Sequence, residues 1–260
     1  MSSIQANYQN YQSDVALYTR SHRSGKKYRY QPAISRRGEP SETSVTPQVQ
    51  RLTQLLLIRH GETDWNLQDL YLGQTDIPLN GTGKKQAKNL TTYLRSTHPD
   101  ISAIYSSDLA RARASAQYAA RAFNTSVHET SALREINWGV VEGLDVPETD
   151  AAYQQRLEAL KKQYPNRTER WAHEPLFPQG ETYNDLLGRV KAELQRIATA
   201  HPGEKVAVFA HGRILRTLVS ESTDHADVYP KLPNCAVVQF RFAPENTHCP
   251  FTCLSINQPA

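Results

Sequence analysis

Hydrophobic residues occur along the chain in short apolar blocks that alternate with longer amphipathic stretches. The short blocks predict strands at 55–58, 101–107, 125–130, 205–210, 235–242 and 251–256. Apolar residues three or four positions apart predict helices at 82–96, 109–123, 151–164, 182–200 and from about 213 onward. Asp108 is expected to cap the second of these helices. The alternation predicts an α/β protein, a three-layer sandwich with a mainly parallel central sheet and helices on both faces.

Two of the apolar blocks end in a histidine that is followed by a glycine. The first block delivers Arg59 and His60, and the block at 205–210 delivers His211 and Gly212. Ligands bind beyond the carboxyl ends of the strands in sheets of this kind, so these residues should meet at one edge. Arg111, at the start of the helix after 101–107, points to the same edge. Glycine there lets the backbone turn sharply or approach a ligand.

Two imidazoles beside several guanidinium groups require an anion, and phosphate fits best because arginine binds its oxygens in pairs. A neutral imidazole beside a bound phosphate can attack phosphorus and form a phosphohistidine. The leaving oxygen then needs a proton from a carboxyl group. The sequence alone leaves four candidates for this acid: Glu62, Asp64, Glu135 and Glu142. Cationic neighbours argue against a metal site, and no cofactor is expected.

The basic charge of the chain belongs to its first 50 residues. The net charge is +4 over 260 residues, and residues 1–50 hold seven Lys and Arg against three Asp and Glu, which alone give +4. The remainder is balanced, so a nucleic-acid-binding domain is not expected. We interpret residues 1–50 as a disordered N-terminal extension and residues 51–260 as the catalytic domain.

Three further features bear on location. No apolar run approaches the length of about 18 residues that a membrane span needs, and the N-terminus has no apolar segment typical of a secretory signal. Cys235, Cys249 and Cys253 are too few and too odd in number for a disulfide framework, and a fourth zinc ligand is lacking. We therefore expect a cytoplasmic protein, although Ser and Arg in the extension leave organellar targeting open.

The stretch LIRHGETDWN resembles the signature of the histidine phosphatase superfamily, which includes the cofactor-dependent phosphoglycerate mutases. Five further segments follow in the order of that family, from about 55 to 240: GQTDIPLNGTGKKQA, YSSDLARA, LREINWGVVEG, PQGETYNDLLGRV and VAVFAHG. Six ordered segments are far more specific than one motif.

The resemblance assigns roles to individual residues. His60 matches the nucleophile, which attacks through Nε2 while a backbone carbonyl holds Nδ1–H. Glu135 matches the proton donor, which selects one of the four carboxyl candidates. The positions that match phosphate-binding residues of the family are Arg59, Asn66, Arg111, His211 and Gly212.

Within the family, the segment between Glu135 and Gly180 spans only about 45 residues, which resembles the phosphatase branch. The expected function is hydrolysis of a small-molecule phosphomonoester. A cofactor-dependent phosphoglycerate mutase and a catalytically weak regulatory or binding member remain alternatives. Arg213 departs from the family's usual second glycine, and it either adds a cation at the pocket, crowds it or faces solvent. Physiological substrate and oligomeric state are not readable from the sequence.

Overall fold

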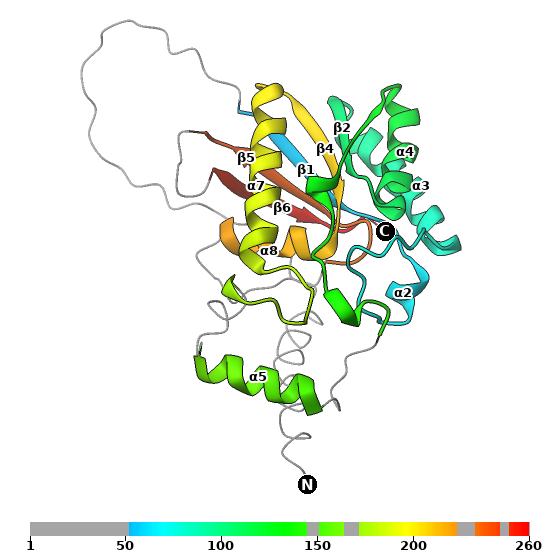
Figure 1. Cartoon of the computed structure of the whole chain (residues 1–260). Helices are drawn as coiled ribbons and strands as arrows, with labels where there is room; N and C mark the ends of the chain where they lie inside the picture. Colours follow the sequence, from blue (N-terminus) through cyan, green and yellow to red (C-terminus); the bar gives the residue numbers. More distant parts are fainter. Residues whose placement is uncertain (1–51, 145–150, 164–171, 223–231, 245–249, 260) are drawn as a thin grey trace, which may run out of the picture. The chain divides into compact units, whose positions relative to one another are not determined.

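The first apolar block forms the strand β1 (Gln54–Arg59), whose four central residues are completely buried. In the computed structural model (Figure 1), residues 52–144, 151–163, 172–222, 232–244 and 250–259 are described. All of them belong to the unit Val49–Ala260. The proposed extension at 1–50 lies outside the described residues, so its boundary with the catalytic domain stays a prediction.

The strands of the described chain form one six-stranded sheet in the order β3-β2-β4-β1-β5-β6. Strands β3, β2, β4 and β1 are mutually parallel, whereas β5 runs antiparallel to β1 and β6 antiparallel to β5. The bounds are Ile101–Ser107 for β2, Val127–Thr130 for β3, Lys205–Ala210 for β4, Val237–Phe242 for β5 and Phe251–Asn257 for β6. The predicted mainly parallel sheet is confirmed.

Helices cover both faces of this sheet (Figure 1). The helices α3 (Gly81–Thr97) and α4 (Ala110–Phe123) pack on one face, and α7 (Tyr183–Ala200) and α8 (Gly212–Ser222) on the other. The remaining helical elements are α2 (Asp64–Leu67), α5 (Ala151–Gln163) and the short 3-10 turns η2 (Ser131–Leu133) and η3 (Gly139–Val141). The predicted three-layer sandwich is confirmed.

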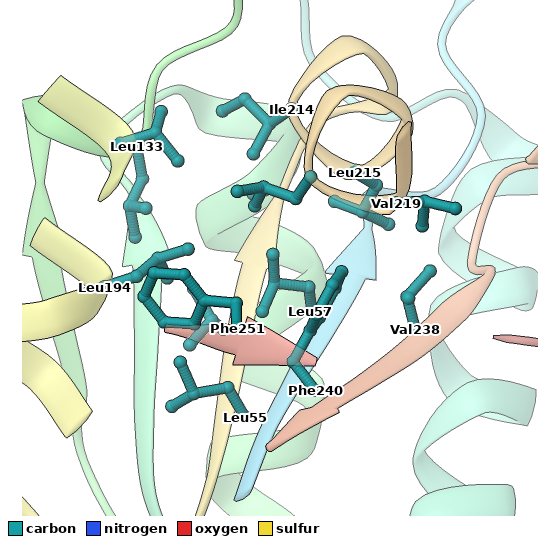
Figure 2. Packing of buried hydrophobic residues seen from close by; sticks show 14 of the residues in the cluster. Leu55, Leu57, Leu133, Leu194, Ile214, Leu215, Val219, Val238, Phe240 and Phe251 are labelled. Carbon is teal, nitrogen blue, oxygen red and sulfur yellow. The ribbon is translucent and has the colours of Figure 1, made fainter. Parts of the chain in front are cut away.

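The alternation of side chains along β1 divides the core into two layers, because successive strand residues point to opposite faces. Leu55 and Leu57 belong to the cluster that contains Leu194 of α7 and Leu215 of α8 (Figure 2). Leu56 and Ile58 belong to the cluster on the side of α3 and α4. A strand buried on both faces explains why its sequence is a continuous apolar run.

One predicted helix cap is wrong. Asp108 does not cap α4, because its carboxylate makes a bidentate ion pair with Arg134 at 2.8 and 2.6 Å. The N-cap position is Leu109, which makes no side-chain cap hydrogen bond. The carboxylate that accepts the Ala110 N–H, at 2.7 Å, comes from Asp76 in a distant loop. A guanidinium group offers Asp108 two charged donors, and one backbone N–H cannot compete with that.

Membrane-spanning helices and the state of the cysteines can be assessed only for the described part of the chain. No helix among the described residues is long and apolar enough to span a membrane. Cys249 lies outside the described residues. Cys235 is buried and Cys253 half-buried, both as free thiols, and burial raises the pKa of Cys235 to about 12.

Candidate active site

The register between β1 and β4 brings the two predicted histidines together. Arg59 is paired with Ala210 across the two parallel strands, so the next residue on each strand, His60 and His211, leaves the same edge. The His60 N–H donates to the Ala210 carbonyl at 3.1 Å. The two imidazole rings meet edge to face, with centroids 5.2 Å apart. The sheet itself therefore sets the distance between them.

One ring nitrogen of His60 is engaged and the other is left for chemistry. Nδ1 lies 2.7 Å from the carbonyl oxygen of Gly61. Because a carbonyl only accepts hydrogen bonds, Nδ1 carries the proton and Nε2 keeps its lone pair. Burial first, and then the charges of Arg111 and Arg59, hold the pKa of His60 well below its usual value. The imidazole is therefore neutral, as a nucleophile requires.

The turn after His60 is packed so tightly that it needs glycine. A Cβ on Gly61 would lie 2.5 Å from the Gly83 carbonyl oxygen at the start of α3. The Gly61 N–H donates to Ser115 Oγ at 3.1 Å, and this hydroxyl in turn donates to the Arg111 carbonyl at 2.8 Å. Ser115 thus links the turn after His60 to α4, a contact that no spacing in the sequence indicated.

His211 is completely buried beside His60. Neither of its ring nitrogens has a hydrogen-bond partner in the described part of the protein. Burial, followed by the charges of Arg111, His60, Arg189 and Arg59, holds the pKa of His211 well below its usual value. Gly212 follows at the start of α8, where a Cβ would lie 3.2 Å from Arg59 Nε. Glycine therefore lets α8 begin directly against this guanidinium group.

The two arginines are held by backbone carbonyls. Arg59 donates from Nη1 to the Leu232 carbonyl at 2.6 Å. Arg111 is completely buried and donates to the carbonyls of Thr75 and Gly73 at 3.0 and 2.6 Å. Burial lowers the pKa of both groups, that of Arg111 to about 10. Both remain cationic at neutral pH.

Several buried nitrogens of this cluster have no hydrogen-bond partner among the described residues, namely Arg59 Nε, Arg111 Nε and the two ring nitrogens of His211. Buried polar groups are normally paired, so unpaired ones grouped in one place indicate a ligand with acceptor atoms. An oxyanion such as phosphate has such acceptors and the opposite charge. The part of the chain that the structure describes contains no group of His, Cys, Asp and Glu suited to hold a metal ion.

Glu135 is the candidate carboxyl group that reaches this cluster. Its side chain is buried, and its oxygens accept the N–H groups of Ile136 at 3.1 Å and Arg213 at 3.0 Å. Arg213 belongs to the first turn of α8, directly after His211. The charge of Glu135 is also the largest influence that raises the pKa of Arg59 and of Arg111 against burial. The negative charge of Glu135 thus acts on both arginines.

The other carboxyl candidates make local structural contacts. Glu62 accepts a hydrogen bond from Asn80 at 3.0 Å, and Asp64 begins α2. Glu142 accepts three backbone N–H groups, from Gln74, Thr75 and Trp138, at 2.7 to 3.1 Å. It thereby organises the loop whose carbonyls hold Arg111.

Asn66 is oriented by two donors. Its Oδ1 accepts the Thr63 N–H at 3.3 Å and Asn234 Nδ2 at 3.2 Å. The amide oxygen is therefore turned toward the protein, and Nδ2, a pure donor, is the group left for a ligand. Asn234 also donates to the His60 carbonyl at 3.0 Å, so it connects His60 to Asn66. Sequence reasoning missed Asn234.

Arg213 does not simply face solvent. Its guanidinium group lies 5.1 Å from the centre of the Trp138 ring, within the range of a cation–π contact. Trp138 itself is buried and packs edge to face against Tyr71 at 5.2 Å. Arg113, two residues after Arg111 on α4, is half-exposed and pairs with Glu129 at 3.5 Å.

The family model of the histidine phosphatase superfamily (branch 1) matches residues 55–251 of this chain. The chain belongs to the histidine phosphatase superfamily. The predicted family and the predicted enzyme class, a phosphatase of the histidine phosphatase type, are thereby confirmed.

Individual relatives of this histidine phosphatase carry both phosphatase and mutase names. It is 32% identical over 196 residues to the uncharacterized phosphatase PhoE of Bacillus subtilis (strain 168), which covers 75% of this chain and 91% of that protein. It is 35% identical over 189 residues to phosphoglycerate mutase-like protein 4 of Arabidopsis thaliana, covering 72% and 79%.

Among solved structures, a phosphoserine phosphatase variant from Entamoeba histolytica in complex with phosphoserine is similar. It aligns with a TM-score of 0.64 at 25% identity and covers 80% of this chain and 98% of that one. These likenesses support the fold and the family.

Proposed function

We propose that this chain is a phosphomonoesterase that hydrolyses a small phosphorylated metabolite through a phosphohistidine on His60, with Glu135 as proton donor. The observation that carries the proposal is the hydrogen bond of 2.7 Å between His60 Nδ1 and the Gly61 carbonyl. It leaves Nε2 unprotonated, inside a buried cluster where Arg59 Nε, Arg111 Nε and the ring nitrogens of His211 have no hydrogen-bond partner among the described residues. In this proposal, a nucleophile, an anion site and an acid act together at one edge of the sheet.

In the first step of the proposed reaction, the Nε2 lone pair of His60 forms a bond to phosphorus as the bond from phosphorus to the leaving oxygen breaks. Glu135 transfers its proton to that oxygen, so the product leaves as an alcohol and Glu135 becomes a carboxylate. Arg59, Arg111 and His211 donate to the non-bridging phosphoryl oxygens, where charge must be held in the transition state.

In the second step, water attacks the phosphohistidine. The Glu135 carboxylate takes a proton from this water as the new oxygen–phosphorus bond forms, and the bond to His60 Nε2 breaks. Inorganic phosphate leaves, and Glu135 is protonated again for the next turnover. Asn66 Nδ2 adds a neutral donor to the phosphate throughout. No metal ion or cofactor enters this scheme.

A phosphoglycerate mutase is the second candidate, because a relative with 35% identity bears a phosphoglycerate mutase-like name. The two functions share the phosphohistidine and differ in its fate. A mutase protects it from water and returns the phosphoryl group to the substrate. A regulatory member would bind phosphorylated ligands and turn over neither.

One pair of assays separates the three. The purified chain is incubated with p-nitrophenyl phosphate and, separately, with 3-phosphoglycerate and bisphosphoglycerate. Phosphate release that disappears in His60→Ala supports the phosphatase. Isomerised phosphoglycerate without phosphate release would instead establish the mutase, and inactivity of the folded protein in both assays would refute the enzyme proposal. A panel of phosphorylated metabolites then identifies the substrate class.

A further inference from the structure

The proposed acid lies on a segment without regular secondary structure. Glu135 falls between η2 and η3, and residues 134–138 belong to no helix or strand. Its carboxylate nevertheless has to stay at the N-terminus of α8, where it accepts the Arg213 N–H at 3.0 Å. Some other part of the protein must therefore fix this segment.

Arg189, in the middle of α7, binds the backbone of this segment directly. Its Nη1 donates to the carbonyls of Ala132 at 2.9 Å and Arg134 at 2.6 Å, and its Nη2 donates to the carbonyl of Glu135 at 3.0 Å. Hydrogen bonds from a charged donor are stronger than neutral ones. One guanidinium group thus binds the acid residue itself and two carbonyls just before it.

Glu181 aligns this guanidinium group and also binds the far side of the segment. Its carboxylate accepts Arg189 Nε at 2.6 Å and Nη2 at 2.8 Å. It also accepts the Asn137 N–H at 3.2 Å, and its own N–H donates to the Asn137 carbonyl at 2.8 Å. Both side chains are mostly buried, 22% and 13% exposed. The ion pair therefore holds the segment on both sides of Glu135.

We infer that Arg189 is a positioning residue for proton donation: it sets the place of Glu135 relative to the leaving group without touching substrate. This inference rests on the proposed role of Glu135. Only the planar, five-donor guanidinium group can bind three carbonyls and a carboxylate together, and lysine cannot. A displaced acid slows the step that needs a proton and leaves attack by His60 in place.

The test compares two substrates of similar shape, phenyl phosphate and p-nitrophenyl phosphate. The nitrophenolate leaves without much help from an acid, whereas the phenolate needs the proton. Arg189→Lys keeps a cation opposite Glu181. We expect it to lower kcat/KM for phenyl phosphate about tenfold more than for p-nitrophenyl phosphate. This factor is smaller than the usual contribution of a general acid, because the acid is displaced and not removed. The ratio of the two values does not depend on how much of the variant is folded.

Arg196→Lys is the matched control, because Arg196 lies on the same helix, is 57% exposed and pairs with Glu193 at 2.7 Å. Its ratio should equal that of the wild type. If Glu135→Gln changes the ratio and Arg189→Lys does not, the positioning role is refuted and the proposed function stands. If Glu135→Gln itself leaves the ratio unchanged, the proposed acid is wrong, and the inference drawn from it is overturned as well.

Discussion

The two halves of the proposed reaction are positioned in different ways. His60 and His211 leave the ends of two adjacent parallel strands, whose register fixes them relative to each other. Glu135 lies on an irregular segment that is held by side chains from distant parts of the chain, above all Arg189. The backbone of the sheet thus places the proposed attacking group, and side-chain hydrogen bonds place the proposed acid.

This difference has an energetic consequence. A strand in the centre of a sheet moves only when the core moves, because its hydrogen bonds and its buried side chains act together. A segment held by a few charged hydrogen bonds can shift when one of them is lost. Substitutions in the two halves should therefore lower activity by different amounts, and the losses should depend on the leaving group in different ways.

The largest effect is expected from His60→Ala. Without Nε2 there is no phosphohistidine, so kcat should fall about 10⁵-fold or more, as when a hydrolase loses its nucleophile. Because attack is lost for every substrate, phenyl phosphate and p-nitrophenyl phosphate should be affected alike. Steady-state kinetics measure the loss of activity, and acid-labile labelling of the protein by phosphate measures the loss of the phosphohistidine. Normal activity and normal labelling of His60→Ala would show that another residue attacks. The control is His128→Ala, at an exposed position on β3, which should leave activity and labelling intact.

Glu135→Gln should give the next largest effect, and one that depends on the leaving group. Glutamine keeps the size of the side chain and lacks a transferable proton. We expect kcat/KM for phenyl phosphate to fall about 10²- to 10³-fold, and that for p-nitrophenyl phosphate less than about tenfold. Equal losses for both substrates would assign Glu135 to binding or structure.

The histidine pair should also make stability depend on pH. The pKa of His60 and of His211 is held well below the usual 6.5, mainly by burial. Below about pH 6.5 the unfolded chain takes up these protons first, so the histidines' contribution to stability is complete above that pH and is lost as the pH falls. Each imidazole should contribute about 1.4 kcal/mol per pH unit to this slope.

Urea denaturation of the wild type and of His211→Asn at pH 7.5 and 5.5 isolates this contribution, because other titrating groups are common to both proteins. The free energy of unfolding of the variant should fall less between the two pH values. If the free energy of unfolding fell by the same amount in both proteins, His211 would take up its proton in the folded state as it does in the unfolded chain.

The sequence predicted the strand-based half of the site for a physical reason. Burial on both faces leaves a continuous apolar run, as in β1, and the residues that follow such runs must meet at one edge of a parallel sheet. This reasoning alone brought His60 and His211 together. For the acid, the residues left four candidates, and only the family resemblance selected Glu135.

Contacts between side chains from remote segments left no such signal. Asp76 accepts a hydrogen bond from Ala110, 34 residues away, while Asp108, which looked like the cap, pairs with Arg134. The residues involved are ordinary polar ones whose partners are decided by the tertiary structure, so neither period nor spacing marks them. Asn234, 168 residues from the Asn66 side chain that it contacts, was missed for the same reason.

The smallest effect is expected from a substitution of Asn234. It tests whether the phosphate-binding half can be disturbed without affecting the acid. Asn234→Ala removes the donor to the His60 carbonyl and one of the two donors to Asn66 Oδ1, so the Asn66 amide keeps only its weaker contact with the Thr63 N–H at 3.3 Å. The loss of about 1 kcal/mol of net hydrogen bonding should weaken inhibition by inorganic phosphate roughly fivefold. Because Asn234 acts on the phosphate and not on the acid, the ratio between the two phenyl phosphates should stay at the wild-type value. Asn257→Ala, on the edge strand β6, should change neither quantity, and unchanged phosphate inhibition in Asn234→Ala would show that the register of β1 alone holds the phosphate-binding half in place.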